Sequence, residues 1–146
     1  MTAALVAVAL AGCAQKPTNT GGAGAATPGS PQDFAVNVGD RVFFTVDSSE
    51  INPTAAGVLD RQATWLQKYS QYQITIEGHA DERGTREYNI ALSARRAEAA
   101  RRYLAGRGIN AGRMRTLSFG KERPVAVCDN ESCWNQNRRA VTVLGG

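Results

Sequence analysis

Asp81 and Arg96 are the residues of this sequence whose types and spacing most strongly suggest binding chemistry. They stand fifteen positions apart. A carboxylate can hold an ammonium group, and a planar guanidinium can hold a carboxylate through two parallel hydrogen bonds. With Asp47 as a second carboxylate, the set matches a small molecule that carries both an ammonium and a carboxylate, as an amino acid does.

Arg96 lies within the apolar stripe of a predicted helix. A charged side chain on a core-facing stripe needs a partner. Two interpretations stay open: the side chain extends along the apolar surface to the rim, or its guanidinium meets a carboxylate of a neighbouring Asp or of a ligand. With residues placed about 100° apart around the helix axis, the stripe consists of Tyr88, Leu92, Ala99, Ala100, Tyr103 and Leu104.

Asp47 and Asp81 are expected at the same edge of a β-sheet. Each lies just beyond a segment whose apolar and polar residues alternate as in a strand. A helix between two such strands implies a parallel crossover, which places both carboxyl ends at one edge. Ligand crevices of open α/β sheets form at that edge.

The elements that must position these residues follow from two periodicities. Alternation predicts strands at 42–46, 73–78, 114–119 and 140–144. Helical spacing predicts one helix from Asn52 and Pro53 to about Tyr69, and a second from about Glu87 to Ala105, before Gly106 and Gly108. The order β-α-β-α-β-β predicts an α/β (α+β) two-layer sandwich, with a four-stranded mixed sheet and both main helices on one face.

One sheet face is expected to be apolar and covered by the helices. The residues assigned to that face are Val42, Phe44 and Val46 in the first strand, Ile74 and Ile76 in the second, Leu117 and Phe119 in the third, and Val141 and Val143 in the fourth.

The amino-terminal region has the features of an export signal. Residues 3–10 form an apolar run of small residues that ends in Leu-Ala-Gly-Cys at Cys13, although no Lys or Arg precedes the run. It is too short to span a bilayer and resembles a secretory h-region with a cleavage site. We therefore expect a signal-peptide remnant at 1–12 and lipidated Cys13, followed by a flexible tether rich in Gly, Ala, Thr and Pro over 13–33 and a folded domain over 34–146.

Cys128 and Cys133 enclose four residues of a polar turn. Export favours a disulfide between them, because disulfides persist in the periplasm. The loop-entropy model gives so small a ring roughly 2 kcal/mol of stabilisation. The alternative is half a zinc site, but two thiols and the single His79 leave one of the usual four ligands missing.

Composition argues against several classes of protein. The 146 residues suit one domain, and the 17 Lys and Arg are interleaved with 13 Asp and Glu, so no one-sign patch for nucleic acid is expected. His79 has no nucleophile or orienting partner in a recognisable pattern, so we predict no catalytic residue, no metal and no cofactor. An envelope hydrolase remains a remote alternative. Asp81 and Glu82 are adjacent in an extended segment and point to opposite sides, so they cannot flank one glycosidic bond.

Several motifs together resemble the peptidoglycan-binding domain of the outer-membrane-protein-A-like family over nearly all of 41–146. They are Gly-His-Ala-Asp-Glu-Arg-Gly-Thr at 78–85, Glu-Tyr-Asn-Ile at 87–90, Leu-Ser-Ala-Arg-Arg-Ala at 92–97, Tyr-Leu at 103–104, Gly-Lys-Glu-Arg-Pro at 120–124 and Asn-Arg-Arg-Ala-Val at 137–141. Behind a lipidation motif and a short tether, the chain is similar in particular to the lipid-anchored members of that family.

The resemblance implies a site and a function. Asp81 and Arg96 would hold the ammonium and the carboxylate of diaminopimelate in peptidoglycan, with Phe44, Asp47, Asn89 and Leu92 around the groove. Thr45 departs from the Asp found there in many members. The resemblance also implies TolB and other Tol proteins as partners, and an outer-membrane location on the periplasmic face, with which Ala14 is consistent. A purely structural, adhesive lipoprotein with an internal Asp81–Arg96 salt bridge stays open as an alternative.

Overall fold

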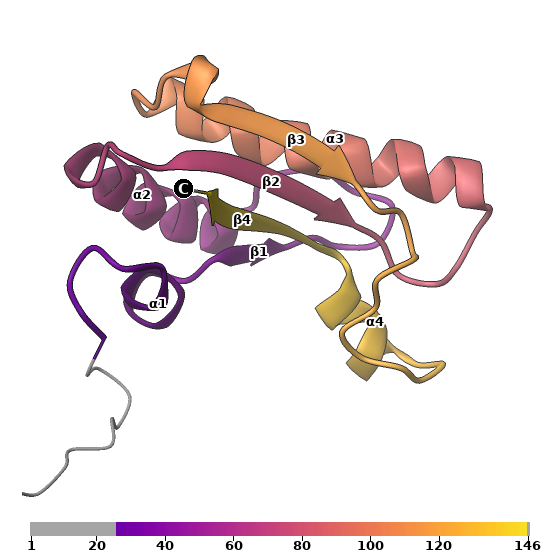
Figure 1. Cartoon of the computed structure of the whole chain (residues 1–146). Coiled ribbons are helices and arrows are strands. Elements are labelled where there is room, and N and C mark those ends of the chain that lie inside the picture. Colours follow the sequence, from indigo (N-terminus) through magenta and orange to yellow (C-terminus); the bar gives the residue numbers. More distant parts are fainter. Residues whose placement is uncertain (1–25, 146) are drawn as a thin grey trace, which may run out of the picture.

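Four strands form one mixed sheet in the order β1-β4-β2-β3 (Figure 1). The computed structural model describes residues 26–145, so the expected signal-peptide remnant (1–12), Cys13 and most of the expected tether (13–33) lie outside it. β4 is antiparallel to both of its neighbours, and β2 is parallel to β3. The carboxyl ends of β1 and β2 therefore meet at one edge, as predicted. The strands are β1 (Arg41–Phe43), β2 (Gln73–His79), β3 (Met114–Ser118) and β4 (Arg139–Gly145).

Two long helices cover one face of the sheet, which confirms the predicted two-layer α+β sandwich. Helix α2 (Pro53–Lys68) begins after Asn52, whose side chain accepts a hydrogen bond from the N–H of Ala55. Helix α3 (Arg86–Gly106) begins after Thr85. It is followed by Gly108, whose φ of 97° lies in the left-handed region that favours glycine. Both helices match their predicted bounds to within one residue.

Gly78 in β2 brings α3 close to the sheet. A Cβ at this position would lie 1.7 Å from the carbonyl oxygen of Ser93 in α3. The helix backbone can therefore rest directly on the strand only because the residue has no side chain. This close approach fixes α3 relative to the end of β2, where Asp81 follows.

The predicted faces of β1, β3 and β4 need correction. β1 ends at Phe43, so Val46 lies outside the strand and is exposed, whereas Phe44 is buried. In β4, Ala140 and Thr142 pair with inward-facing Gly78 and Ile76. Val141 and Val143 therefore lie on the outer face, as does exposed Leu117 in β3.

A buried polar contact decides the orientation of β4. The Oγ1 of Thr142 donates to the Oε1 of Gln62 at 2.8 Å, and the Nε2 of Gln62 donates to the carbonyl oxygen of Gly39 at 2.8 Å. Gln62 is fully buried. Thr142 faces inward because this polar group of α2 needs a partner in the core.

The buried face of α3 is shifted from the predicted stripe. Tyr88 is exposed, and Ala99 and Tyr103 are half-buried. Small and polar residues take their places because α3 rests so closely on β2. The buried set is Asn89, Leu92, Ser93, Arg96, Ala97, Ala100 and Leu104.

The structure contains short helical elements that periodicity did not predict. Helix α4 lies between β3 and β4, at the same end of the sheet as the loop that follows β2 (Figure 1). Such elements span too few residues to show a clear hydrophobic period. They are α1 (Pro31–Asp33), a π-helix (Phe34–Val38), a 3₁₀ helix (Ala111–Arg113) and α4 (Glu131–Asn137).

Residues just before the expected domain start at Phe34 contact the domain. The hydroxyl of Tyr72 donates to the carbonyl oxygen of Gly29 at 2.6 Å, and the Nε1 of Trp65 donates to the Oδ2 of Asp33 at 2.9 Å. The folded unit therefore includes residues from Gly29 onward. No helix within residues 26–145 is both long and apolar enough to cross a membrane.

Candidate functional site

A hollow of about 180 Å³ lies at the edge of the sheet where β1 and β2 end, and we call it the edge pocket. Its walls come from the segment after β1, the loop after β2 and the first turns of α3. Asp81 and Arg96 both contribute to it. The lining residues are Val46, Asp47, Ala80, Asp81, Arg83, Gly84, Tyr88, Asn89, Leu92 and Arg96.

Arg96 is fully buried and does not reach the rim. Its Nε donates to the carbonyl oxygen of Ser48 at 2.9 Å, its Nη1 to that of His79 at 3.0 Å and its Nη2 to that of Thr45 at 3.2 Å. A guanidinium has five N–H groups. Two of them therefore have no acceptor among residues 26–145.

Arg96 keeps its charge despite its burial. Burial, and after it the positive charge of Arg138, lower the pKa of Arg96 to about 10, although Asp81, Tyr88 and Asp47 act in the opposite direction. A pKa of about 10 leaves the guanidinium protonated at neutral pH. The floor of the pocket therefore carries a fixed positive charge.

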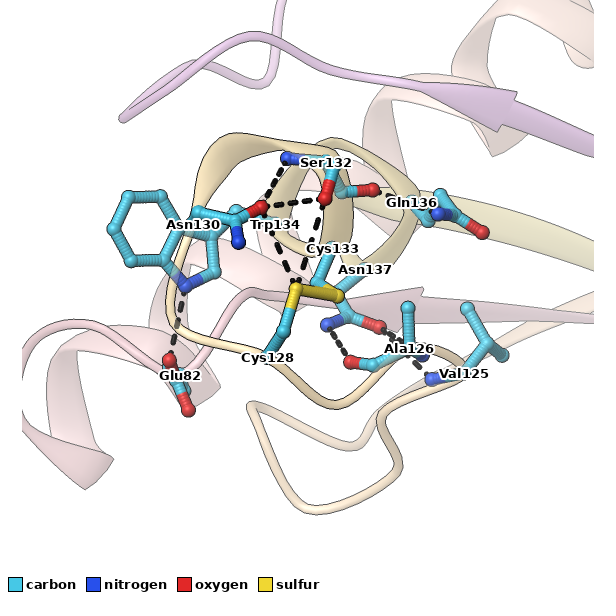
Figure 2. The surroundings of a disulfide bond; sticks show 10 residues. All are labelled: Glu82, Val125, Ala126, Cys128, Asn130, Ser132, Cys133, Trp134, Gln136 and Asn137. Carbon is cyan, nitrogen blue, oxygen red and sulfur yellow. Dashed lines mark hydrogen bonds between the residues drawn. A yellow bond between two sulfur atoms is a disulfide. The ribbon is translucent and has the colours of Figure 1, made fainter.

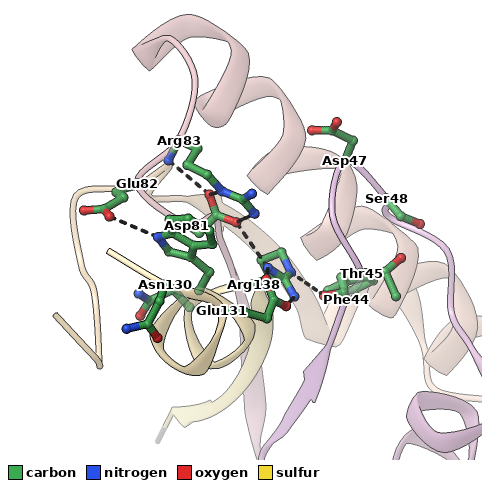
Figure 3. A network of polar contacts seen from close by, with 12 residues as sticks. Phe44, Thr45, Asp47, Ser48, Asp81, Glu82, Arg83, Asn130, Glu131 and Arg138 are labelled. Carbon is green, nitrogen blue, oxygen red and sulfur yellow. Dashed lines mark hydrogen bonds and ion pairs between the residues drawn. The ribbon is translucent and has the colours of Figure 1, made fainter. Parts of the chain in front are cut away.

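Asp81 is paired with Arg83 and Arg138 rather than with Arg96 (Figure 3). Its Oδ1 accepts from the main-chain N–H of Arg83 at 3.0 Å, and its Oδ2 accepts from the Nη2 of Arg83 at 2.9 Å and from the Nη1 of Arg138 at 3.4 Å. Burial raises the pKa of Asp81, but the hydrogen bonds from Arg83 and Arg138 outweigh it and lower the pKa below its usual value. Asp81 is therefore ionised at neutral pH.

Asp47 supplies a second, more accessible carboxylate. Its backbone is left-handed, with φ 54°, and its Oδ1 accepts from the hydroxyl of Tyr88 at 2.8 Å. This bond links the segment after β1 to α3 beside the edge pocket and raises the pKa of Tyr88. The Oδ2 of Asp47 has no hydrogen-bond donor within the described residues.

Comparisons with known proteins agree with this geometry. The family model described as "OmpA family" matches residues 43–139. The peptidoglycan-associated lipoprotein of Rhizobium meliloti is 65% identical over 153 residues, covering 100% of this chain and 87% of that protein. The one from Brucella melitensis is 64% identical over 151 residues, covering 99% and 90%. The crystal structure of the peptidoglycan-associated lipoprotein from Burkholderia pseudomallei superposes with a TM-score of 0.74 at 39% identity, covering 80% of this chain and 100% of that one.

The chain belongs to the OmpA family. Within that family it groups with the peptidoglycan-associated lipoproteins, because the match to those relatives extends over the full chain. The four strands and the helices that cover them are the OmpA-family domain. The edge pocket lies where the β2–α3 loop of this domain meets the end of β1.

Of the three other residues predicted for the site, two line the edge pocket and one does not. Leu92 and Asn89 line the edge pocket, and the Nδ2 of Asn89 donates to the carbonyl oxygen of Arg83 at 2.8 Å. Phe44 does not line it. The centroid of its ring lies 5.4 Å from the Cζ of Arg96, so Phe44 supports the guanidinium from the core.

Arg83 and Arg138 are residues that the sequence analysis missed. Arg83 follows Asp81 by two positions, so the sequence alone could have predicted that the two residues lie close together. Arg138 lies between α4 and β4, fifty-seven positions away, and only the fold brings it to Asp81. Its Nε also donates to the carbonyl oxygen of Phe44 at 2.8 Å, which fixes its direction.

His79 is part of the sheet rather than of the edge pocket. Its ring is buried and stacks on Phe119, with the centroids 5.3 Å apart. Burial and the nearby positive charges of Arg139, Arg123 and Arg41 lower the pKa of His79 to about 4, so the ring is neutral at pH 7. Among residues 26–145, no three His, Cys, Asp or Glu side chains are grouped to hold a metal ion.

Cys128 and Cys133 form a disulfide, with their Cα atoms 5.6 Å apart (Figure 2). Their sulfur atoms are therefore not available as zinc ligands. The bond closes the turn that begins α4, and Asn130 in that turn caps the helix by accepting from the N–H of Ser132.

Proposed function

We propose that this chain is a lipid-anchored outer-membrane protein that binds peptidoglycan non-covalently, through diaminopimelate in the stem peptide. The observation that carries the proposal is the edge pocket itself. It presents the buried, charged guanidinium of Arg96 opposite the carboxylates of Asp81 and Asp47. The two relatives described above are peptidoglycan-associated lipoproteins, which supports this function.

Each end of the proposed ligand has a partner in the pocket. The two available N–H groups of Arg96 donate to the carboxylate at the side-chain end of diaminopimelate. The ammonium lies between Asp81 and Asp47. Asp47 offers the free acceptor atom, since the oxygens of Asp81 already accept bonds from Arg83 and Arg138. Asp81 contributes its negative charge at short range.

We assign the membrane attachment to Cys13. Acylation there would hold the domain on the outer membrane, and two or more acyl chains are needed for stable anchoring. The residues up to Gly29 would then let the domain reach peptidoglycan from the periplasmic face. Mass spectrometry of the purified full chain tests this assignment, and an unmodified Cys13 would contradict it.

We propose, from the family resemblance, that the protein is a member of the Tol–Pal system. In that role the protein would contact TolB and other Tol proteins, maintain envelope integrity and help constrict the outer membrane at division. A TolB surface that overlaps the edge pocket predicts that TolB and peptidoglycan compete. Simultaneous binding of purified TolB and soluble peptidoglycan fragments would contradict the overlap.

Sedimentation with purified sacculi tests the binding function. Asp81→Asn and Asp47→Asn each remove one pocket charge, and Glu50→Gln removes a charge from an exposed residue outside the pocket. We expect both pocket variants to bind at least about tenfold more weakly, a loss of about 1.4 kcal/mol, while the control sediments like the unaltered chain. Equal sedimentation of all four proteins would refute the proposed site, and turnover of the sacculi would favour a hydrolase instead.

A further inference from the structure

Helix α4 packs against the arginines that surround Asp81. Glu131 forms an ion pair with the Nη2 of Arg138, whose Nη1 contacts the Oδ2 of Asp81 at 3.4 Å. The side chain of Trp134 lies under Arg83, with the guanidinium carbon 3.9 Å from the ring centroid. Figure 3 shows Glu131 and Arg138 on the Asp81 side of α4.

A second contact ties α4 to the loop that carries Asp81. The Nε1 of Trp134 donates to the Oε1 of Glu82 at 3.0 Å (Figure 2). Trp134 therefore touches both residues that follow Asp81 in the chain. The orientation of the Asp81 carboxylate depends on α4 through two independent routes, one through Arg138 and one through the loop.

The disulfide holds the half of α4 that makes these contacts. The helix has seven residues, from Glu131 to Asn137, too few to be stable alone in water. At its far end, buried Asn137 accepts from the N–H of Val125 at 2.8 Å and donates to the carbonyl oxygen of Ala126 at 2.8 Å. At its beginning, the covalent link is the bond from Cys133 back to Cys128.

We propose that α4, closed by the Cys128–Cys133 disulfide, is a positioning element for the edge pocket, so that the affinity of the pocket for its ligand depends on the disulfide. The inference rests on the proposed function and adds that the disulfide regulates ligand affinity. Glu131 and Trp134 are the positioning residues. They act through Arg138 and Arg83, because orientation of binding groups by supporting contacts governs affinity.

Reduction of the disulfide removes its effect on the edge pocket. A dithiol such as dithiothreitol transfers two electrons and two protons to the sulfurs of Cys128 and Cys133, which become thiols, and the reagent itself becomes a cyclic disulfide. Both cysteines are half-exposed, so the reagent can reach them. Loss of the bond lets the start of α4 separate from the loop after β2.

Calorimetry with a soluble disaccharide-peptide that contains diaminopimelate tests the inference. We expect the oxidised chain to bind on the order of tenfold more tightly than the reduced chain or the Cys128→Ser/Cys133→Ser double variant. Trp134→Ala should match the reduced chain. Asn135→Ala, an exposed position on the same helix, should match the oxidised chain.

The indole N–H signals of the two tryptophans separate positioning from a general loss of fold. Reduction should shift the NMR signal of Trp134. The signal of Trp65, which lies in the hydrophobic core, should stay unchanged. Ligand added to the oxidised chain should shift the Trp134 signal as well. This inference would be overturned, while the proposed function stands, if the oxidised and reduced chains bound the ligand with equal affinity. It would also be overturned if added ligand did not shift the Trp134 signal. An oxidised chain that binds no ligand would overturn both.

Discussion

Asp81 and Arg96 line the same pocket and yet are not each other's partners. Asp81 pairs with Arg83 and Arg138, whereas Arg96 donates to three main-chain carbonyl oxygens. Both charges therefore face the pocket without neutralising each other directly. This arrangement argues against the alternative of a structural lipoprotein with an internal Asp81–Arg96 salt bridge.

Arg96→Ala should destabilise the fold as well as the site. The change leaves the carbonyl oxygens of Thr45, Ser48 and His79 without their donor, and we expect a loss of about 3–5 kcal/mol in the free energy of unfolding. Urea denaturation measures it. Arg95→Ala, at an exposed neighbouring position, should stay within about 0.5 kcal/mol. A stable Arg96→Ala protein would show that the three bonds contribute little.

Gly78→Ala should separate α3 from β2. Its Cβ would meet the carbonyl oxygen of Ser93 at 1.7 Å, so the helix must move, at a cost of about 3 kcal/mol or more. Gly106→Ala is the matched control. No atom lies within 4 Å of a Cβ built there, and alanine favours the helix. Thermal unfolding of the two variants should differ strongly. Similar midpoints would contradict the close approach.

Stability should fall between pH 6.5 and about 4 because of His79. Its pKa is about 4 in the folded chain, against 6.5 normally, so the unfolded chain binds the extra proton in that window. The contribution lost is at most about 3 kcal/mol. Urea midpoints measured across this range should fall more steeply in the unaltered chain than in His79→Gln. The lowered pKa of Asp81 adds a loss only at lower pH, below its usual value of 3.8.

Sacculi with diaminopimelate should be preferred over lysine-type walls. A lysine side chain ends in an ammonium without the adjacent carboxylate, so the available N–H groups of Arg96 would stay unpaired in the pocket. Leaving a buried charged donor without a partner costs about 1–3 kcal/mol, or roughly tenfold or more in affinity. Competition between soluble fragments of the two wall types measures the preference, and equal affinities would contradict the role given to Arg96.

The sequence was sufficient to predict the elements that have strong local signals. Asn52 and Pro53 marked the start of α2, and alternation located the four strands. The faces of β4 were predicted wrongly, because Val141 and Val143 are the more apolar pair of the alternation and yet face outward. Thr142 faces inward instead, where it donates to buried Gln62.

The site was predictable to the extent that it is local. Asp81 and Arg96 were singled out by residue type, and by an arginine in an apolar stripe. Arg138 and Trp134 were not, because their contacts with the loop after β2 cross more than fifty positions. A helix of seven residues has no period long enough to reveal it.

Gly29 and Asp81 lie at opposite ends of β2. The carbonyl oxygen of Gly29 is held by Tyr72, immediately before the strand, and Asp81 comes two residues after its end. A domain anchored through its amino-terminal side and gripped at the pocket would carry mechanical tension lengthwise along its strands. The ladder bonds run across the strands, so such a pull strains many of them at once instead of unzipping them in turn. In the proposed role, the strands would therefore bear such a pull together and resist shear.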